Sequence, residues 1–376
     1  MNNNVGIYIH FPFCKSKCKY CNFNSFANKD NLQLDYFKSM IKEISMYGNK
    51  KINIDTIFIG GGTPSLMFDG CISTLISELR KKFTILDGCE ITIEGNPNSI
   101  TQSKVREWKE CGVNRVSVGL QTVNSNSLKL IGRTHTKKDY INAIETIKSI
   151  GINNINTDCL IGLPKQKLSH VKHTLGLISK LGCTHMSVYS LILEENTPLF
   201  DMVERGVVKL PKEEKVLGMY NFAFKYLAEM GFDRYEVSNF AKDGYECKHN
   251  LHTWQMREYI GFGAGAHSYY DGFRYCNVDS IEEYIKLVKE NNKPLNENEK
   301  VNEDGLYEET IMLGLRTKYG INLDEIKTNF GKDLLKDKNE IILDMLNNKL
   351  IKIENNNLIA TDLGFTVLNK VILELI

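Results

Sequence analysis

"INTDCLIGLPKQKLSHVKHTLGLISKLGCTHMSVYSL", residues 155 to 191, contains one complete strand, helix and strand unit. The run at each end is rich in β-branched and apolar residues and predicts a buried strand. Between them, HVKHTLGLISKLG (170–182) carries apolar residues at intervals of three and four and ends in glycine, which is typical of an amphipathic helix. This order predicts two parallel strands joined by a helix that covers the sheet.

The same unit recurs throughout the first half of the chain. Amphipathic segments such as LQLDYFKSMIKEISMYG (32–48) and CISTLISELRKKF (71–83) separate the runs that predict strands. The predicted strands are residues 5–11, 56–62, 90–96, 115–121, 155–162 and 185–191. Such an α/β alternation favours a partial or full β/α barrel, and the alternative is a doubly wound open sheet.

After residue 205 the pattern changes. We predict a helix near 213–230, a strand at DRYEVSNF (233–240) and a glycine- and aromatic-rich stretch at GFGAGAHSYYDGFRY (261–275). Polar NNKPLNENEKVNED (291–304) indicates a linker or surface loop.

The last part of the chain predicts a small winged-helix-like α+β domain. Its short helices alternate with LIKIENNNLIATDLG (350–364), which we interpret as the wing. The near-neutral charge of this part argues against DNA binding. The resulting division of the chain is 1–205 for the barrel core, 206–290 for an extension and 291–376 for the C-terminal domain.

Composition limits the partners and the compartment. The 376 residues include 47 Lys and Arg against 46 Asp and Glu, so the net charge of +1 gives no general field for nucleic acid or anionic lipid. MNNNVGIYIHFPF (1–13) lacks the features of a signal peptide, and we find no apolar run long enough for a membrane span. We therefore expect a cytosolic protein that is not an integral membrane protein.

The chain has ten cysteines, which reducing conditions in the cytosol would keep free of structural disulfides. Single cysteines in such a chain commonly behave as small apolar core residues. Seven are scattered in this way: Cys71, Cys89, Cys111, Cys159, Cys183, Cys247 and Cys276.

The other three cysteines lie together in YIHFPFCKSKCKYCNF (8–23), directly after the first predicted strand. Chemistry in parallel β/α domains collects at the carboxyl ends of the strands. A structural zinc site needs a fourth N or S ligand, and although His10 is near, no second pair of ligands is evident. An iron–sulfur cube held by three thiolates leaves one iron open to a small molecule. A zinc-stapled binding module remains the non-catalytic alternative.

The spacing C-x3-C-x2-C, with Tyr20 before the last thiol, resembles the signature of radical S-adenosylmethionine (SAM) enzymes. The run YIH that begins at Tyr8 is similar to the oxygen-independent coproporphyrinogen III oxidase group within them. The resemblance implies a partial (β/α)6 barrel that holds a 4Fe–4S cluster through Cys14, Cys18 and Cys21, with SAM on the open iron.

Further motifs match that family in chain order, and its residues at these places contact SAM. Carboxylates suit the ribose hydroxyls or the amino group, Arg and Gln suit the carboxylate, and glycine permits close backbone approach to the methionine end. Each side chain alone could instead be a cap, a loop amide or a solvated charge. On this basis Gly62→Val would weaken SAM binding and spare the cluster. The matching positions are Tyr8, Tyr20, Gly61, Gly62, Thr63, Glu94, Gln121, Arg133 and Asp158.

YEVSNFAKDGYECKHNLHTW (235–254) and YIGFGAGAHSY (259–269) resemble the heme chaperone branch of that family, called HemW. The oxidase continues C-x-C after the triple, whereas Phe23 ends that pattern here. The branch's HNxxYW motif has Thr253 in place of its Tyr. The resemblance implies heme binding, transfer to heme-requiring respiratory proteins and an electron donor such as a flavodoxin or ferredoxin. The alternative is an oxygen-independent coproporphyrinogen III oxidase.

CKHNLHTW (247–254) offers the candidate heme ligands. Imidazole and thiolate are both common axial ligands of heme iron, and Trp254 offers apolar surface. With the resemblance, we rank His249 first, His252 second and Cys247 third. Histidines without such a context are more often hydrogen-bonded structural groups.

Overall fold

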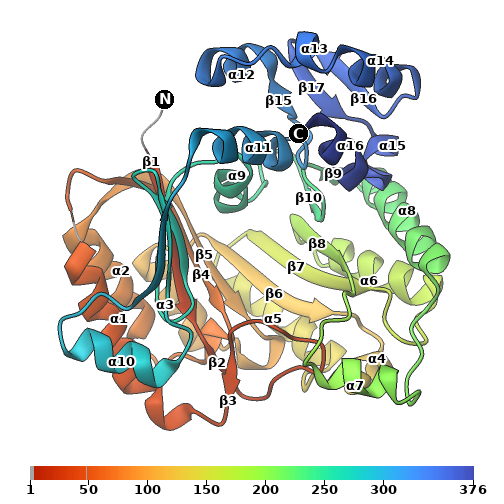
Figure 1. Cartoon of the computed structure of the whole chain (residues 1–376). Helices are drawn as coiled ribbons and strands as arrows, with labels where there is room; N and C mark the ends of the chain where they lie inside the picture. The colour runs from red at the N-terminus through yellow and green to blue at the C-terminus, as the bar shows by residue number, and fades with distance from the viewer. Residues whose placement is uncertain (1–3, 48) are drawn as a thin grey trace.

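The computed structural model describes residues 4–47 and 49–376, and the largest of its sheets is a curved one of 12 strands (Figure 1). Six parallel strands make its centre, and each pairs with the next along the chain. They are β1 (Asn4–Phe11), β4 (Asn53–Gly61), β5 (Thr84–Gly95), β6 (Arg115–Gln121), β7 (Asn154–Ile161) and β8 (His185–Ser190). The predicted partial β/α barrel is therefore confirmed.

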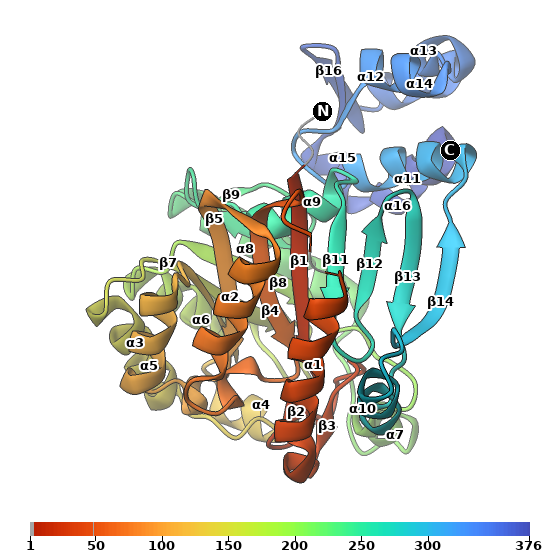
Figure 2. The same ribbon diagram turned by 90° about the vertical axis from the view of Figure 1, so that its left-hand side faces the viewer.

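Helices cover the outer face of these strands (Figure 2). Isoleucines of the strands, such as Ile57 and Ile59 of β4, are buried in the core against Leu75 and Leu79 of the covering helices. The covering helices are α1 (Gln33–Tyr47), α2 (Cys71–Lys82), α3 (Gln102–Cys111), α5 (Lys137–Ser149), α6 (Leu168–Lys180) and α8 (Glu213–Glu229). Shorter elements follow the strands: β2 (Phe13–Cys14), β3 (Phe26–Ala27), η1 (Asp30–Leu32), η2 (Pro64–Leu66), η3 (Pro97–Ser99), α4 (Ser125–Leu130) and α7 (Pro198–Glu204).

Local sequence fixes where these helices begin. At α5 the Thr136 hydroxyl accepts from the Asp139 amide at 3.2 Å, and the Asp139 carboxylate accepts from the Thr136 amide at 2.7 Å. This reciprocal capping box satisfies two donors that a helix start otherwise leaves free.

Short strands extend the sheet at both edges. Beyond β8 lie β10 (Asn239–Ala241) and β9 (Asp233–Arg234), and beyond β1 lie β11 (Tyr259–Phe262), β12 (His267–Tyr270), β13 (Phe273–Asn277) and β14 (Leu295–Lys300). Two helices belong to this part, α9 (Lys248–Trp254) and α10 (Ile281–Lys289).

Two sequence predictions were wrong in this extension. The predicted single strand 233–240 folds back on itself, because Glu236 accepts from the Ser238 amide at 3.3 Å and Phe240 pairs with Arg234. The predicted loop 291–304 contains the edge strand β14, which pairs with β13 on one side only. Its side chains are nearly all exposed, so no apolar alternation marks it in the sequence.

The C-terminal part has its own core, which includes Ile311, Leu315 and Leu358. Its elements are α11 (Glu303–Gly314), β15 (Ile321–Asn322), α12 (Leu323–Phe330), α13 (Leu334–Asp337), α14 (Asn339–Asn347), β16 (Ile351–Glu354), β17 (Asn357–Ala360), α15 (Asp362–Thr366) and α16 (Leu368–Leu375). The predicted wing is the hairpin of β16 and β17, whose turn uses Asn355 and Asn356 at positive φ. This order confirms the winged-helix-like α+β fold.

No helix within the described residues has both the length and the apolar composition needed to cross a membrane.

A buried carboxylate joins the extension to the barrel. Glu43 of α1 is fully buried and accepts from the Gly263 amide at 2.9 Å, the Asn277 amide at 2.7 Å and the Tyr284 hydroxyl at 2.6 Å. Burial raises its pKa to about 7, although these three donors oppose the shift.

We expect Glu43→Gln to flatten the pH dependence of stability. The native state binds this proton more tightly than the unfolded state does, so the stability from this group is present below about pH 4.5 and falls as the pH rises to about 7. The slope can reach about 1.4 kcal/mol per pH unit. Denaturant unfolding of parent and variant at several pH values measures it, and parallel pH profiles for the two proteins would contradict the prediction.

Candidate functional site

The cysteine loop follows β1 and lies at the carboxyl ends of the parallel strands, near β2 and β3 (Figure 1). All three thiols are partly exposed, and each contacts a different neighbour. Two of these neighbours, Thr63 and Arg133, come after β4 and β6, so the loop is tied to two strand ends. The sulfur contacts are Cys14 Sγ with Thr63 Oγ1 at 3.5 Å, Cys18 Sγ with Arg133 Nη1 at 3.5 Å, and Cys21 Sγ with Ser25 Oγ at 3.9 Å.

Asn96 completes a hydrogen-bonded arc between two of the thiols. Its amide nitrogen donates to Thr63 Oγ1 at 3.2 Å, and its amide oxygen accepts from Arg133 Nη2 at 2.7 Å. The arc therefore runs from Cys14 through Thr63, Asn96 and Arg133 to Cys18. Sequence reasoning missed Asn96, although it stands in the same EGNP motif as Glu94.

Charge at the loop suits thiolates. Burial alone would lower the pKa of Arg133, but Cys18 and Tyr20 outweigh it and the pKa is raised, so this side chain is a permanent cation beside a sulfur. Burial raises the pKa of Cys14, and the hydroxyl of Thr63 partly offsets this because it donates to the sulfur. A guanidinium and a hydroxyl are thus hydrogen-bond donors beside two of the sulfurs that would bind an iron–sulfur cluster.

The described residues contain no group of three or more His, Cys, Asp and Glu side chains gathered around one metal-ion position. A zinc staple requires such convergence of its ligands on one ion. A 4Fe–4S cube does not, because each thiolate binds a different iron. Three thiols on one loop therefore fit a three-thiolate cluster, and the zinc-stapled module stays the alternative.

Two predicted carboxylates lie inside the barrel near this edge. Glu94 accepts from the Gly61 amide at 3.2 Å, and burial together with the nearby Asp158 charge raises its pKa to about 8. Asp158 accepts from the Asn156 amide at 2.8 Å, and burial raises its pKa as well. Carboxyl groups with such raised pKa values can donate or accept toward the hydroxyl and amino groups of a ligand.

The remaining predicted positions lie around the same edge. Gln121 ends β6 at a φ of 69°, a left-handed conformation that interrupts the register with β7. Tyr20 packs near Ile131 in a small apolar cluster. The Tyr8 hydroxyl lies 3.0 Å from His10 Nδ1, and since His10 Nε2 donates to a backbone carbonyl at 2.8 Å, Nδ1 accepts from Tyr8.

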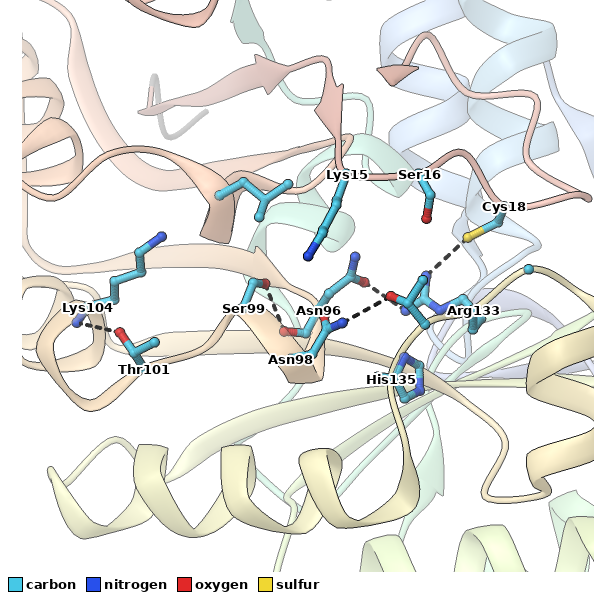
Figure 3. Close-up of a pocket in the computed structure, with 13 residues that line it drawn as sticks. Lys15, Ser16, Cys18, Asn96, Asn98, Ser99, Thr101, Lys104, Arg133 and His135 are labelled. Atoms are coloured by element: carbon cyan, nitrogen blue, oxygen red, sulfur yellow. Dashed lines mark hydrogen bonds between the residues drawn. The ribbon is translucent and has the colours of Figure 1, made fainter. Parts of the chain in front are cut away.

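A cavity of about 270 Å³ lies between the cysteine loop and the segments 96–104 and 132–135 (Figure 3). Polar amides and hydroxyls line it, together with the cations Lys15, Lys104 and Arg133. The cavity therefore offers an anionic or polar group a place directly beside Cys18.

The structure gives a reason for glycine at positions 61 and 62 that the sequence did not indicate. A Cβ on Gly62 would lie 2.7 Å from the Phe13 carbonyl oxygen and 2.9 Å from the Pro12 carbonyl carbon. A Cβ on Gly61, where φ is 109°, would lie 2.7 Å from the His10 ring. The expectation that Gly62→Val spares the cluster stays a prediction, and these contacts argue against it because added bulk would displace the loop that carries Cys14.

The predicted heme segment lies at the other end of the strands. Figure 1 and Figure 2 both place α9 near the start of β1, opposite β2 and β3. His249 is buried, and its Nδ1 shares a hydrogen bond of 3.0 Å with Thr56 Oγ1. The ring also stacks with Phe58. His252 is buried and lies 3.0 Å from Asp55. Both rings are thus packed against the start of β4, through Thr56 and Asp55. Their role as heme ligands remains a prediction.

Burial lowers the pKa of His249 to about 3, so its ring is neutral, as a metal ligand must be. Cys247 is fully buried, and Thr253, which replaces the Tyr of the related motif, is exposed. Of the seven single cysteines, Cys111 is partly buried and the other six are buried, as predicted for core residues.

Comparison with known proteins identifies relatives of the whole chain. Residues 8–178 match the model of the radical SAM superfamily, and residues 301–367 match that of the HemN C-terminal domain. The chain is 36% identical over 332 residues to the heme chaperone HemW of Bacillus subtilis, which covers 87% of each chain. It is 35% identical over 364 residues to HemW of Lactococcus lactis, covering 97% of this chain and 95% of that one.

One solved structure has nearly the same extent. The fold matches coproporphyrinogen III oxidase (HemN) of Escherichia coli, a radical SAM enzyme, with a TM-score of 0.86 over 99% of this chain and 90% of that chain. The sequence identity is 20%, so this likeness shows the fold.

Proposed function

Because the chain belongs to the HemW family of the radical SAM superfamily, we propose that it is a heme chaperone that binds a 4Fe–4S cluster, SAM and heme. The observation that carries the proposal is the set of three thiols at the carboxyl edge of the barrel, tied to the predicted SAM residues by the arc through Asn96.

Cys14, Cys18 and Cys21 would hold the cluster, which when bound supplies single electrons to the SAM sulfonium. Arg133 would balance the charge of the thiolates and reach the carboxylate of SAM. Glu94 and Asp158 would face its hydroxyl and amino groups from inside the barrel. Tyr8, Tyr20, Gly61, Gly62, Thr63 and Gln121 would complete this contact set, as the family resemblance implies.

The partners we propose follow from the relatives named heme chaperone. The cargo is heme, the recipients are heme-requiring respiratory proteins, and the electron donor is a flavodoxin or ferredoxin. We place this exchange in the cytosol, which suits a protein whose ten cysteines are all free in the structure.

Anaerobic purification followed by heme titration tests the proposal. We expect about four irons per chain, SAM binding, and a Soret band that saturates with heme. Incubation with coproporphyrinogen III, SAM and a reductant should give no protoporphyrinogen IX. Formation of that product would instead establish the oxidase, and a preparation that takes up neither iron nor heme would overturn the proposal.

A fourth thiol of the C-x-C type is absent from the loop sequence, where Asn22 and Phe23 follow Cys21. Phe23 is 66% exposed, so this position is directed to solvent. This departure supports the chaperone over the oxidase.

For the heme segment we predict that His249→Ala lowers heme affinity at least tenfold or shifts the Soret band, while iron content and SAM affinity persist. The imidazole bonds to Thr56 near the start of β4, away from the thiols, although its ring also stacks with Tyr8 at 6.4 Å between ring centroids. The SAM measurement therefore shows whether the two sites are separate. Absorbance titration measures heme, and iron analysis and calorimetry measure the rest. His173→Ala, an exposed histidine of α6, is the control.

The double variant His249→Ala/His252→Ala removes both imidazoles, so that His252 cannot take the place of His249 as the ligand of the heme iron. If heme titration and Soret position match the parent in both variants, this segment does not ligate heme. If the variants lose only thermal stability, the two histidines are structural core residues and not heme ligands.

A further inference from the structure

A line of buried polar groups crosses the barrel from α9 to Asp158. The Cys247 amide donates to the Tyr235 hydroxyl at 3.2 Å, and that hydroxyl lies 2.8 Å from His185 Nε2. His185 Nδ1 lies 2.7 Å from Asn156 Oδ1, and Asn156 Nδ2 lies 2.8 Å from Asp158 Oδ1. Tyr235 and His185 are fully buried, and Asn156 is nearly so.

The hydrogen bonds along the line form one consistent set of donors and acceptors. Asn156 gives both amide hydrogens to Ser117 Oγ and Asp158 Oδ1, so its oxygen accepts from Ser187 Oγ and from His185 Nδ1. His185 is then protonated on Nδ1, and its Nε2 accepts from the Tyr235 hydroxyl. Burial lowers the pKa of His185 well below its usual value, which keeps the ring neutral in this form.

This arrangement satisfies Asn156 in full. The amide makes two donated and two accepted hydrogen bonds, which is its full capacity for good geometry. In this arrangement Asn156 presents its NH2 to Asp158 and its oxygen to His185, so the orientation of the amide and the tautomer of the ring depend on each other.

The other end of the line holds the first turn of α9. Cys247 is the residue before this helix, and its amide bonds to Tyr235 while its sulfur donates to Glu90 at 3.5 Å. The His249 amide donates to the same Glu90 oxygen at 3.2 Å. The predicted heme segment thus begins at two buried side chains, Glu90 of β5 and Tyr235 of the extension, and Tyr235 leads to Asp158.

We propose that Tyr235, His185 and Asn156 are positioning residues that orient Asp158 for SAM and couple SAM binding to the order of the α9 segment. The inference rests on the proposed function, since it takes SAM as the ligand of Asp158.

Hydrogen exchange of the parent protein tests the coupling without any substitution. Saturation with SAM should slow amide exchange in peptides that cover residues 245–254 by at least threefold, although these residues lie at the opposite end of the strands from the cluster loop. SAM that binds while exchange in 245–254 stays unchanged would overturn the coupling and leave the proposed function intact. If the parent protein holds its cluster but binds no SAM, both the coupling and the proposed function are overturned.

Tyr235→Phe tests the relay itself, since it removes one hydroxyl and keeps the buried ring. We expect unchanged iron content, a dissociation constant for SAM raised about threefold to tenfold, and loss of the SAM-dependent protection of residues 245–254 at saturating SAM. In an Asp158→Asn background the same substitution should change SAM affinity no further, because the group it orients is already altered.

Tyr140→Phe is the matched control. Its hydroxyl is also buried and also bonds to β7, through Thr157 at 3.0 Å on the opposite face of the strand. We expect it to lower thermal stability and to leave SAM affinity and exchange in 245–254 as in the parent. The proposed role of Tyr235 would be overturned if Tyr235→Phe bound SAM as tightly as the parent. It would also be overturned if Tyr140→Phe lost as much SAM affinity as Tyr235→Phe.

Discussion

Alanine in place of Cys14, Cys18 or Cys21 is expected to abolish the iron–sulfur cluster. A cube with only two protein thiolates lacks the protein ligand of a second iron, because each of the three thiolates binds a different iron. SAM binding through the open iron should disappear with the cluster. Of the changes considered for this protein, these have the largest expected effect on function.

Iron and sulfide analysis with the visible absorbance of the anaerobically purified protein measures this loss. Cys111→Ala is the matched control, since Cys111 is also partly exposed but lies in α3 and has its sulfur bonded to a backbone carbonyl. Cys71→Ala, in α2, is a second control. Both should keep their iron. A variant of any of the three loop cysteines that retains the cluster, or zinc at equal occupancy in the triple variant, would contradict the assignment.

The parallel core was predictable because its signals are local. Each central strand is an apolar run, and the helix after it shows its own period, so the order of elements follows from short windows of sequence. The cysteine triple was equally local, since three thiols within eight residues leave few chemical alternatives. Adjacent strand ends then brought Glu94 and Asp158 near the loop, as the topology of a parallel sheet requires.

The interior network could not be predicted in this way. Thr56 and His249 share a hydrogen bond although almost two hundred residues separate them, and nothing in either neighbourhood points to the other. His185 and Tyr235 are likewise joined by a hydrogen bond across 50 residues of chain. The edge strand β14 was missed for another reason: its exposed, charged residues lack the apolar alternation by which strands are found.

The structure gives Gly62 a different role from the one that the sequence motif suggested. The sequence placed Gly62 beside SAM because glycine lets a ligand approach. In the structure the space of its missing side chain is occupied by the backbone of residues 12 and 13, which leads directly into Cys14. Small size at position 62 is therefore needed to seat the cysteine loop before any ligand arrives.

Gly62→Ala is accordingly expected to lower cluster content and SAM affinity together. The added methyl carbon would lie 2.7 Å from the Phe13 carbonyl oxygen, closer than real contacts allow, and backbone on both sides leaves no flexible group to yield. Overpacking of this kind costs about 1–3 kcal/mol, which the loop would relieve by moving Cys14 away from Thr63. Iron content should fall severalfold, and calorimetry should show weaker SAM binding in the fraction that keeps its cluster.

Gly218→Ala makes the same chemical change where no atom lies within 4 Å of the added carbon. Because Gly218 lies inside α8, alanine there should stabilise the protein by about 0.5–1 kcal/mol and leave iron and SAM unchanged. The contrast between two glycine-to-alanine variants separates the loop contact from a general effect of the substitution. If Gly62→Ala kept full iron and lost only SAM affinity, the glycine would serve the ligand directly, and the seating of the cysteine loop would not depend on it.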